Sequence, residues 1–227
     1  MCVNYTPSRK DLLNEKFEAE LSSNMDWKNE IWQDYSAPFI RHNEAQKREI
    51  LVGAYSMIPK SKMAADAKRF STMNARAETI DQLRSYAQPW KEGMRCLVPM
   101  QNFFEPNYES GRAERWKIGL HNETDFAVAG LYKVWPEPDG ESYSFTQLTI
   151  NADQHPLMRR FHKPGEEKRS LVILHKNDYD AWLACSTSAS ARFFLQLYPV
   201  DLMHAELMAK PEVTKPETKQ IDLFSFD

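Results

Sequence analysis

Cysteine is scarce in this chain, and its three cysteines stand far apart, at Cys2, Cys96 and Cys185. This spacing forms neither a disulfide framework nor a CxxC site for zinc or redox chemistry, so we expect a reducing compartment. Six histidines are scattered without an HExxH motif, and neither GxxxxGK[ST] nor GxGxxG occurs. These absences leave the zinc-hydrolase and nucleotide-binding classes without support, and we expect no metal and no cofactor.

Long apolar runs are also absent, since stretches such as LVIL at residues 171–174 are far too short to cross a bilayer. The first residues have neither the basic n-region nor the apolar h-region of a signal peptide. We therefore expect a soluble, cytoplasmic protein with no membrane partner. A length of 227 residues, 42% of them hydrophobic, predicts one domain over residues 1–227, with 209–227 as an extended tail.

Apolar periodicity indicates more strands than helices. Helical spacing predicts an amphipathic helix over residues 9–21, a short helix over 78–87, and another after Asp178, whose side chain we expect to cap it. Strands are predicted at residues 48–59, 95–106, 115–120, 126–135, 142–151 and 170–175. Closely spaced strands with few helices between them favour an α+β fold, with a mostly antiparallel, barrel-like β core and flanking helices.

Positive charge is concentrated locally, although the net charge is −3. Residues 60–84 carry six lysines and arginines against three acids, and RRFHKPGEEKR at residues 159–169 is also basic. Local fields rather than net charge steer a polyanion toward a protein, so these segments keep a nucleic-acid partner open.

The second residue offers unusual chemistry. Methionine aminopeptidase removes Met1 readily when the next residue is small, which would leave Cys2 with an amine and a thiol two bonds apart. An α-amine titrates near about 8, so part of it is unprotonated at neutral pH. Such an amine can form a Schiff base with an aldehyde, and the thiol can then close a thiazolidine ring. The alternative is that a small residue at position two has no function.

The segment TMNARAET places Asn74, Arg76 and Glu78 at alternating positions, so an extended backbone would put their side chains on one face. An asparagine can hydrogen-bond an amine or an oxyanion, an arginine suits a phosphate, and a glutamate can fix the arginine. A solvated loop without function is the alternative.

Two further segments contain candidate acid–base residues. Glu105 stands beside two phenylalanines in QNFFEP, where desolvation would raise its pKa and help it to move protons. His155 and His162 lie in a basic approach to a strand, and His162 could reach a pocket as a general acid or base. A solvent-facing glutamate and surface or core histidines remain the alternatives.

Four motifs in one order resemble the SOS response-associated peptidase (SRAP) family of abasic-site processing proteins, over about residues 2–200. They are MC at the N-terminus, NARAET, FFEP and NADQHPLMRRFHKPGEEKR. The resemblance implies an α+β fold with a barrel-like sheet and a basic groove for single-stranded DNA. It also implies that Cys2, freed of Met1 by autoproteolysis or an aminopeptidase, forms a thiazolidine cross-link with the ring-opened aldehyde of an abasic site.

The resemblance further assigns roles to individual residues. Asn74 would position the cysteine and the sugar, Glu105 would hold the α-amine and assist Schiff-base formation, and His162 would help to open the deoxyribose ring. Contacts with the strand are expected from Asn4, Tyr55, Arg76, Arg84, Arg160 and Arg169. The chain departs from the family at MCVN, at YSMIPKS and in the insertion KPGEEK. We still expect Tyr55 to stack on a base.

The partner implied is single-stranded DNA containing abasic sites, bound by a monomer near the nucleoid during the SOS response to DNA damage. A peptidase and a lyase activity belong to the same expectation. Two alternatives stay open. The first is a cysteine peptidase or amidohydrolase with an N-terminal nucleophile. The second is a non-catalytic single-stranded DNA-binding module in which Cys2 is incidental.

Overall fold

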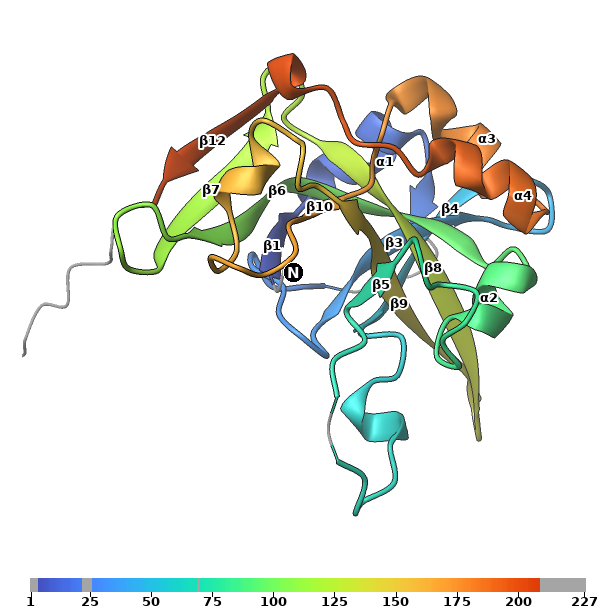
Figure 1. The fold of residues 1–227 in the computed structure, drawn as a ribbon. Coiled ribbons are helices and arrows are strands. Elements are labelled where there is room, and N and C mark those ends of the chain that lie inside the picture. Colours follow the sequence, from blue (N-terminus) through green and yellow to red (C-terminus); the bar gives the residue numbers. More distant parts are fainter. Residues whose placement is uncertain (1–3, 22–25, 69, 209–227) are drawn as a thin grey trace, which may run out of the picture.

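Five strands close into a barrel in the computed structural model, which describes residues 4–21, 26–68 and 70–208 (Figure 1). In barrel order they are β8 (Phe126–Glu137), β9 (Gly140–Asn151), β4 (Arg48–Tyr55), β3 (Ser36–His42) and β6 (Arg95–Asn107). Pairing of β6 with β8, from Arg95 opposite Leu131 to Met100 opposite Phe126, closes the ring. Closure pairs the two edges that an open sheet would expose.

The other described strands extend this barrel. They are β1 (Asn4–Pro7), β2 (Glu20–Leu21), β5 (Asn74–Arg76), β7 (Glu114–Leu120), β10 (Arg169–Leu171), β11 (Ile173–Leu174) and β12 (Met203–Leu207). β1 pairs with β6, β7 joins β6 to β12, and both β5 and β10 pair with β9. Most pairs are antiparallel, with β2–β4, β4–β9 and β5–β9 parallel. The predicted α+β fold with a mostly antiparallel, barrel-like core is confirmed.

Apolar side chains fill the barrel and also cover its outer wall, because successive residues of a strand point to opposite faces. Along β6, Cys96 and Val98 belong to the interior cluster, whereas Leu97 belongs to the outer one. The helices that cover the outer cluster are α1 (Lys10–Phe17), α2 (Ala87–Lys91), α3 (Tyr179–Leu183) and α4 (Ser188–Ala191) (Figure 1). Within the described ranges, no helix has the length and apolarity needed to cross a membrane.

The helix predictions have mixed outcomes. The helix expected over residues 9–21 is present only as the shorter α1 (Lys10–Phe17), and Glu20–Leu21 form strand β2 instead. The helix expected over 78–87 is wrong, because residues 77–86 form successive turns and α2 begins at Ala87. Tertiary contacts override the helical pattern there: Ile80 is buried, and the Tyr86 hydroxyl donates to the carbonyl oxygen of Asn74. Asp178 directly precedes α3, but its side chain makes no capping hydrogen bond to any described residue.

The strand expected at residues 170–175 is divided in two, and each of the other predicted segments contains one strand. At Val172 the chain changes partner between β10 and β11. Its N–H donates to the carbonyl oxygen of Leu148 on β9, and its own carbonyl oxygen accepts from the N–H of Ala129 on β8. Cys2 and the tail at 209–227 lie outside the described residues.

Candidate active site

A carboxyl group and an imidazole meet inside the protein near the end of β6. Oε2 of Glu105 lies 3.3 Å from Nε2 of His162, and the two side chains are only 3% and 4% exposed. Neither of these atoms has a hydrogen-bond partner of good geometry among the described residues. Buried polar groups are normally hydrogen-bonded, so this pair is suited to hold a further polar group.

Burial sets the charge of both groups. Loss of solvation raises the pKa of Glu105 to about 8 and lowers the pKa of His162 to about 4, because burial disfavours the charged form of each. The nearby positive charges of Lys168 and Arg169 lower the pKa of His162 further. At neutral pH the site therefore holds a protonated carboxylic acid beside a neutral imidazole, which are a proton donor and a proton acceptor.

The end of β6 fixes the position of His162. The histidine has a φ of 64°, a left-handed conformation that costs a non-glycine residue about 1–2 kcal/mol. Its N–H donates to the carbonyl oxygen of Pro106 over 2.9 Å. Just before it, Phe161 forms a β-bridge with Asn107, whose side-chain amide donates to the carbonyl oxygen of Arg160 over 3.1 Å. These contacts hold the imidazole against the strand that carries its carboxyl partner.

The predicted NAR segment forms β5, which runs parallel to β9. Asn74 is 7% exposed, whereas the Arg76 side chain is 46% exposed. Glu78 lies beyond the strand, in a turn, and its carboxylate binds Arg169. The expected pairing of Glu78 with Arg76 is therefore wrong, and the alternation of side chains applies to β5 alone.

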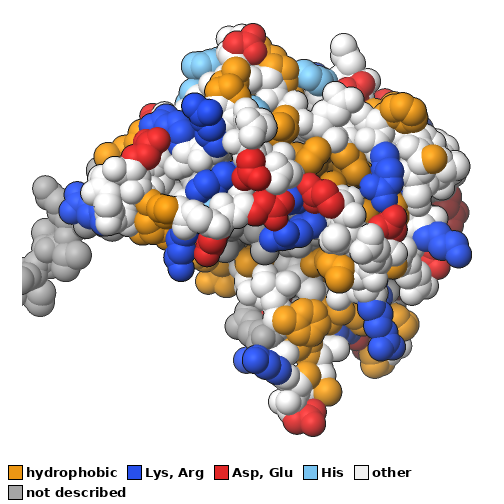
Figure 2. Space-filling model, in the orientation of Figure 1, with side chains coloured by type: hydrophobic (Ala, Val, Ile, Leu, Met, Phe, Trp, Pro, Cys, Tyr) orange, Lys and Arg blue, Asp and Glu red, His pale blue; other side chains and the backbone are white. Residues whose placement is uncertain are grey.

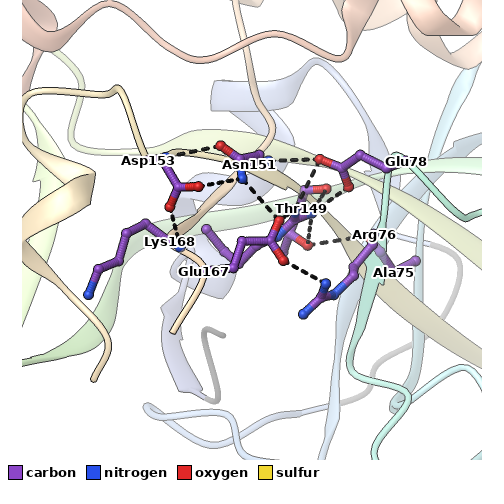
Figure 3. Close-up of polar contacts among 9 residues, drawn as sticks. Ala75, Arg76, Glu78, Thr149, Asn151, Asp153, Glu167 and Lys168 are labelled. Atoms are coloured by element: carbon purple, nitrogen blue, oxygen red, sulfur yellow. Dashed lines mark hydrogen bonds and ion pairs between the residues drawn. The ribbon is translucent and has the colours of Figure 1, made fainter. Parts of the chain in front are cut away.

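Glu167 joins two arginines above β9 (Figure 3). Its Oε2 lies 2.6 Å from Nη1 of Arg76, and its Oε1 accepts a hydrogen bond of 2.7 Å from Nη1 of Arg169. The Arg169 guanidinium also donates to both carboxylate oxygens of Glu78, over 2.9 and 2.8 Å, and to the carbonyl oxygen of Thr149. Arg169 is thus a buried cation held by two carboxylates.

Lys168 holds down the loop that follows His162. Its Nζ donates to the carbonyl oxygens of His162 and Lys163, over 3.1 and 2.9 Å. Its N–H donates to the carboxylate of Asp153 over 2.8 Å, a contact visible in Figure 3. The loop of residues 163–168 is therefore attached at its C-terminal end as well as at the histidine.

Three residues expected to contact DNA are buried instead. Tyr55 is fully buried: its ring stacks on Phe145 and its hydroxyl donates to Gln147 over 2.9 Å, so the described structure leaves no ring face for a base. Arg169 is 2% exposed and committed to its carboxylates. Asn4 is 3% exposed, and its side-chain amide donates to the carboxylate of Glu30. The expectation that these three side chains contact DNA directly is therefore corrected: in the structure they stabilise the fold.

Three other arginines remain at the surface. Arg76 and Arg84 are exposed, and the Arg160 guanidinium forms two hydrogen bonds with Glu109 while it lies 5.1 Å from the centre of the Trp116 ring. On the face of the molecule drawn in Figure 2, acidic and basic side chains are interspersed. The surface on this face is therefore of mixed charge.

Sequence reasoning missed two residues of the site. Asn107 directly follows the FFEP motif, yet only the fold reveals that its amide supports the histidine segment. Glu167 belongs to the insertion KPGEEK, and this departure from the family pattern is the sequence feature that could have pointed to it. Of the two histidines considered, His162 lies beside Glu105, whereas His155 binds backbone groups, including the carbonyl oxygen of Tyr198.

Comparisons with known proteins agree with this fold. The model of the family described as SOS response associated peptidase (SRAP) matches residues 1–215. The abasic site processing protein YoqW of Bacillus subtilis is 29% identical over 155 residues, which cover 65% of this chain and 66% of that protein. The abasic site processing protein HMCES of Pongo abelii is 23% identical over 144 residues, which cover 50% of this chain and 41% of that protein.

Solved structures show the same architecture. A crystal structure of a protein from Bordetella bronchiseptica has a TM-score of 0.82 and 31% identity, and the match covers 92% of this chain and 100% of that one. A protein from Bacteroides thetaiotaomicron has the same fold, with a TM-score of 0.76 at 22% identity. Fold and site together define a β-barrel protein with an acid–base pair buried close to its N-terminal strand. The chain belongs to the SRAP family.

Proposed function

We propose that this protein processes abasic sites in single-stranded DNA by linking Cys2 covalently to the ring-opened sugar. The observation that carries the proposal is the buried pair of Glu105 and His162, a proton donor and a proton acceptor whose atoms lie 3.3 Å apart. Relatives named abasic site processing proteins support abasic DNA as the substrate.

The register of β1 supports a place for Cys2 beside this pair. Asn4 stands opposite Phe104, the neighbour of Glu105 on β6. Two residues of chain span at most about 7 Å, so Cys2 stays within that distance of Asn4. An N-terminal amine and thiol in this region can react with an aldehyde that the acid–base pair holds.

The proposed reaction begins with ring opening. His162 accepts the proton of the anomeric hydroxyl and returns it to the ring oxygen, which leaves the open-chain aldehyde. The α-amine of Cys2 adds to the aldehyde carbon, and Glu105 gives a proton to the hydroxyl that departs as water. The iminium nitrogen then returns a proton to Glu105, which leaves a neutral Schiff base. The thiol then adds to the same carbon of the Schiff base, and its proton goes to the nitrogen. Aldehyde, amine and thiol thus become a thiazolidine and water, without oxidation or reduction.

Other residues bind and orient the strand in this proposal. Asn74 positions the sugar and the cysteine, while Arg76, Arg84 and Arg160 contact the phosphates. Phosphate contacts carry little sequence information, so we expect little sequence preference. Removal of Met1 by autoproteolysis or an aminopeptidase, lyase activity and a role in the SOS response complete the proposal, for a cytoplasmic, nucleoid-associated monomer.

The test uses a single-stranded oligonucleotide with one abasic site and purified protein whose intact mass shows that Met1 is absent. We expect an adduct that survives heating on a denaturing gel. Cys2→Ala should abolish the adduct, whereas Cys185→Ala, which removes a buried thiol, should retain it. Absence of an adduct with the wild-type protein, or its persistence in Cys2→Ala, would overturn the proposal. Cleavage of unrelated peptides without an adduct would indicate a general peptidase instead.

A further inference from the structure

The proposed phosphate ligand Arg76 already binds an anion within the protein. Its Nη1 lies 2.6 Å from Oε2 of Glu167, and the two side chains are 46% and 33% exposed (Figure 3). Arginine binds carboxylates and phosphates through the same planar arrangement of N–H donors. Glu167 therefore holds part of the guanidinium that a DNA phosphate would use.

The carboxylate of Glu167 is anchored from the inside of the protein. Its Oε1 accepts hydrogen bonds from Arg169 over 2.7 Å and from the Asn151 amide over 3.1 Å. Arg169 is itself fixed by two hydrogen bonds to Glu78. One carboxylate oxygen is thus bound to a rigid, buried partner, while the other contacts the exposed arginine.

Glu167 carries its negative charge at neutral pH. Partial burial acts to raise its pKa, but hydrogen bonds from Asn151 and Arg169 outweigh this and hold the pKa below its usual value. The contact with Arg76 is therefore an ion pair. An exposed ion pair is weak, so a phosphate delivered by a bound strand can replace it.

We infer that Glu167 is an intramolecular competitor for Arg76, which lowers the affinity of the protein for single-stranded DNA. The strand must displace the carboxylate before a phosphate binds the guanidinium. This inference rests on the proposed function and adds a residue that sets the affinity of the same site.

The test compares the affinities of five proteins for a fluorescent single-stranded oligonucleotide without an abasic site, by fluorescence anisotropy at low salt. They are the wild type, Glu167→Gln, Glu166→Gln, Arg76→Ala and the double variant Arg76→Ala/Glu167→Gln. Glu167→Gln keeps an oxygen for Arg169 and Asn151 but lacks the charge. We expect it to bind up to about five-fold more tightly, the factor that corresponds to an exposed ion pair.

Glu166→Gln is the matched control, because it removes the same charge from the neighbouring exposed position. Its affinity should stay close to that of the wild type, and Glu167→Gln should give no gain when Arg76 is alanine. Equal affinities of Glu167→Gln and Glu166→Gln, or an undiminished gain in the double variant, would overturn the inference while strand binding itself persists. Failure of the wild type to bind any strand would instead defeat the proposed function, and the inference with it.

Discussion

Glu105 and His162 lie 3.3 Å apart in the interior, and burial shifts their pKa values in opposite directions, to about 8 and about 4. Near neutral pH the carboxyl group of Glu105 therefore keeps its proton, and the imidazole of His162 stays neutral. Had the two groups formed an ion pair, the proton would be on the imidazole instead.

Folding stability should fall as the pH rises from about 6.5 to about 8. In this window Glu105 keeps its proton in the folded state, whereas its unfolded-state pKa is near 4.5, so the folded protein binds more protons. The loss is roughly 2 kcal/mol. Below about pH 6.5 the lowered pKa of His162 has the opposite effect on stability. There the imidazole is protonated in the unfolded state and neutral in the folded state, which offsets the proton held by Glu105 in the folded state.

Urea unfolding of the wild type and Glu105→Gln at pH 6.5 and pH 8 measures this fall, and the difference between the proteins removes the contributions of other groups. The fall should be absent in Glu105→Gln. Identical pH dependence in both proteins would contradict a raised pKa at Glu105.

The rate of adduct formation should have a maximum close to pH 8. It rises as the α-amine loses its proton, with a pKa near about 8, and falls as Glu105 loses the proton that it donates. Glu105→Gln should react at least about a hundred-fold more slowly at pH 7 and keep only the rising limb. Quenched time courses between pH 6 and pH 9.5 measure both rates. A wild-type rate that continues to climb above pH 9 would rule out Glu105 as the donor.

Asn107→Ala should slow adduct formation about ten-fold or more, because the segment before His162 loses one of the contacts that hold it to β6. The free energy of unfolding should decrease by about 1–3 kcal/mol, since the carbonyl oxygen of Arg160 loses a donor. Asn43→Ala is the matched control: its side chain also hydrogen-bonds the backbone, but it accepts from the N–H groups of Ala45 and Lys47 in the turn between β3 and β4. An equal effect of both substitutions on the rate would show that Asn107 acts only through stability.

Arg169→Lys should lower the free energy of unfolding by about 3 kcal/mol. A lysine cannot reproduce the two hydrogen bonds to Glu78 together with the one to Glu167, and the carboxylates would be left partly unpaired. Arg84→Lys, at an exposed position, should leave stability unchanged. Urea unfolding and strand affinity distinguish a structural role of Arg169 from a contact with DNA. Unchanged stability together with weakened DNA binding would show that Arg169 contacts the strand.

Local sequence patterns predicted four of the five barrel strands, because alternation and apolar content depend on near neighbours, but they did not predict β3 (Ser36–His42). The burial of Glu105 was predictable for the same reason, since Phe103 and Phe104 precede it in the same strand. The helix expected over residues 78–87 failed, because contacts of Ile80 and Tyr86 with distant segments decide that backbone.

The environments of Tyr55 and Arg169 could not be derived in this way. One of the two carboxylates that hold the buried Arg169 comes from Glu78, 91 positions earlier in the chain. The sequence indicates only weakly that Tyr55 is buried, since Tyr55 ends an apolar strand in which inward-facing residues alternate. The partner of its hydroxyl group, Gln147, lies 92 positions away in the chain. Pairings over such separations follow from the closed sheet and not from local periodicity.

The loop between His162 and Arg169 is attached independently at both ends, by β6 at the histidine and by the contacts of Lys168 and Arg169 at the other end. Residues 163–167 between these attachments are exposed. Insertions and deletions can therefore accumulate in this stretch during evolution without displacing the reactive imidazole. The same freedom would let a chain of this fold gain or lose the anion that faces Arg76 without disturbing the pair of Glu105 and His162.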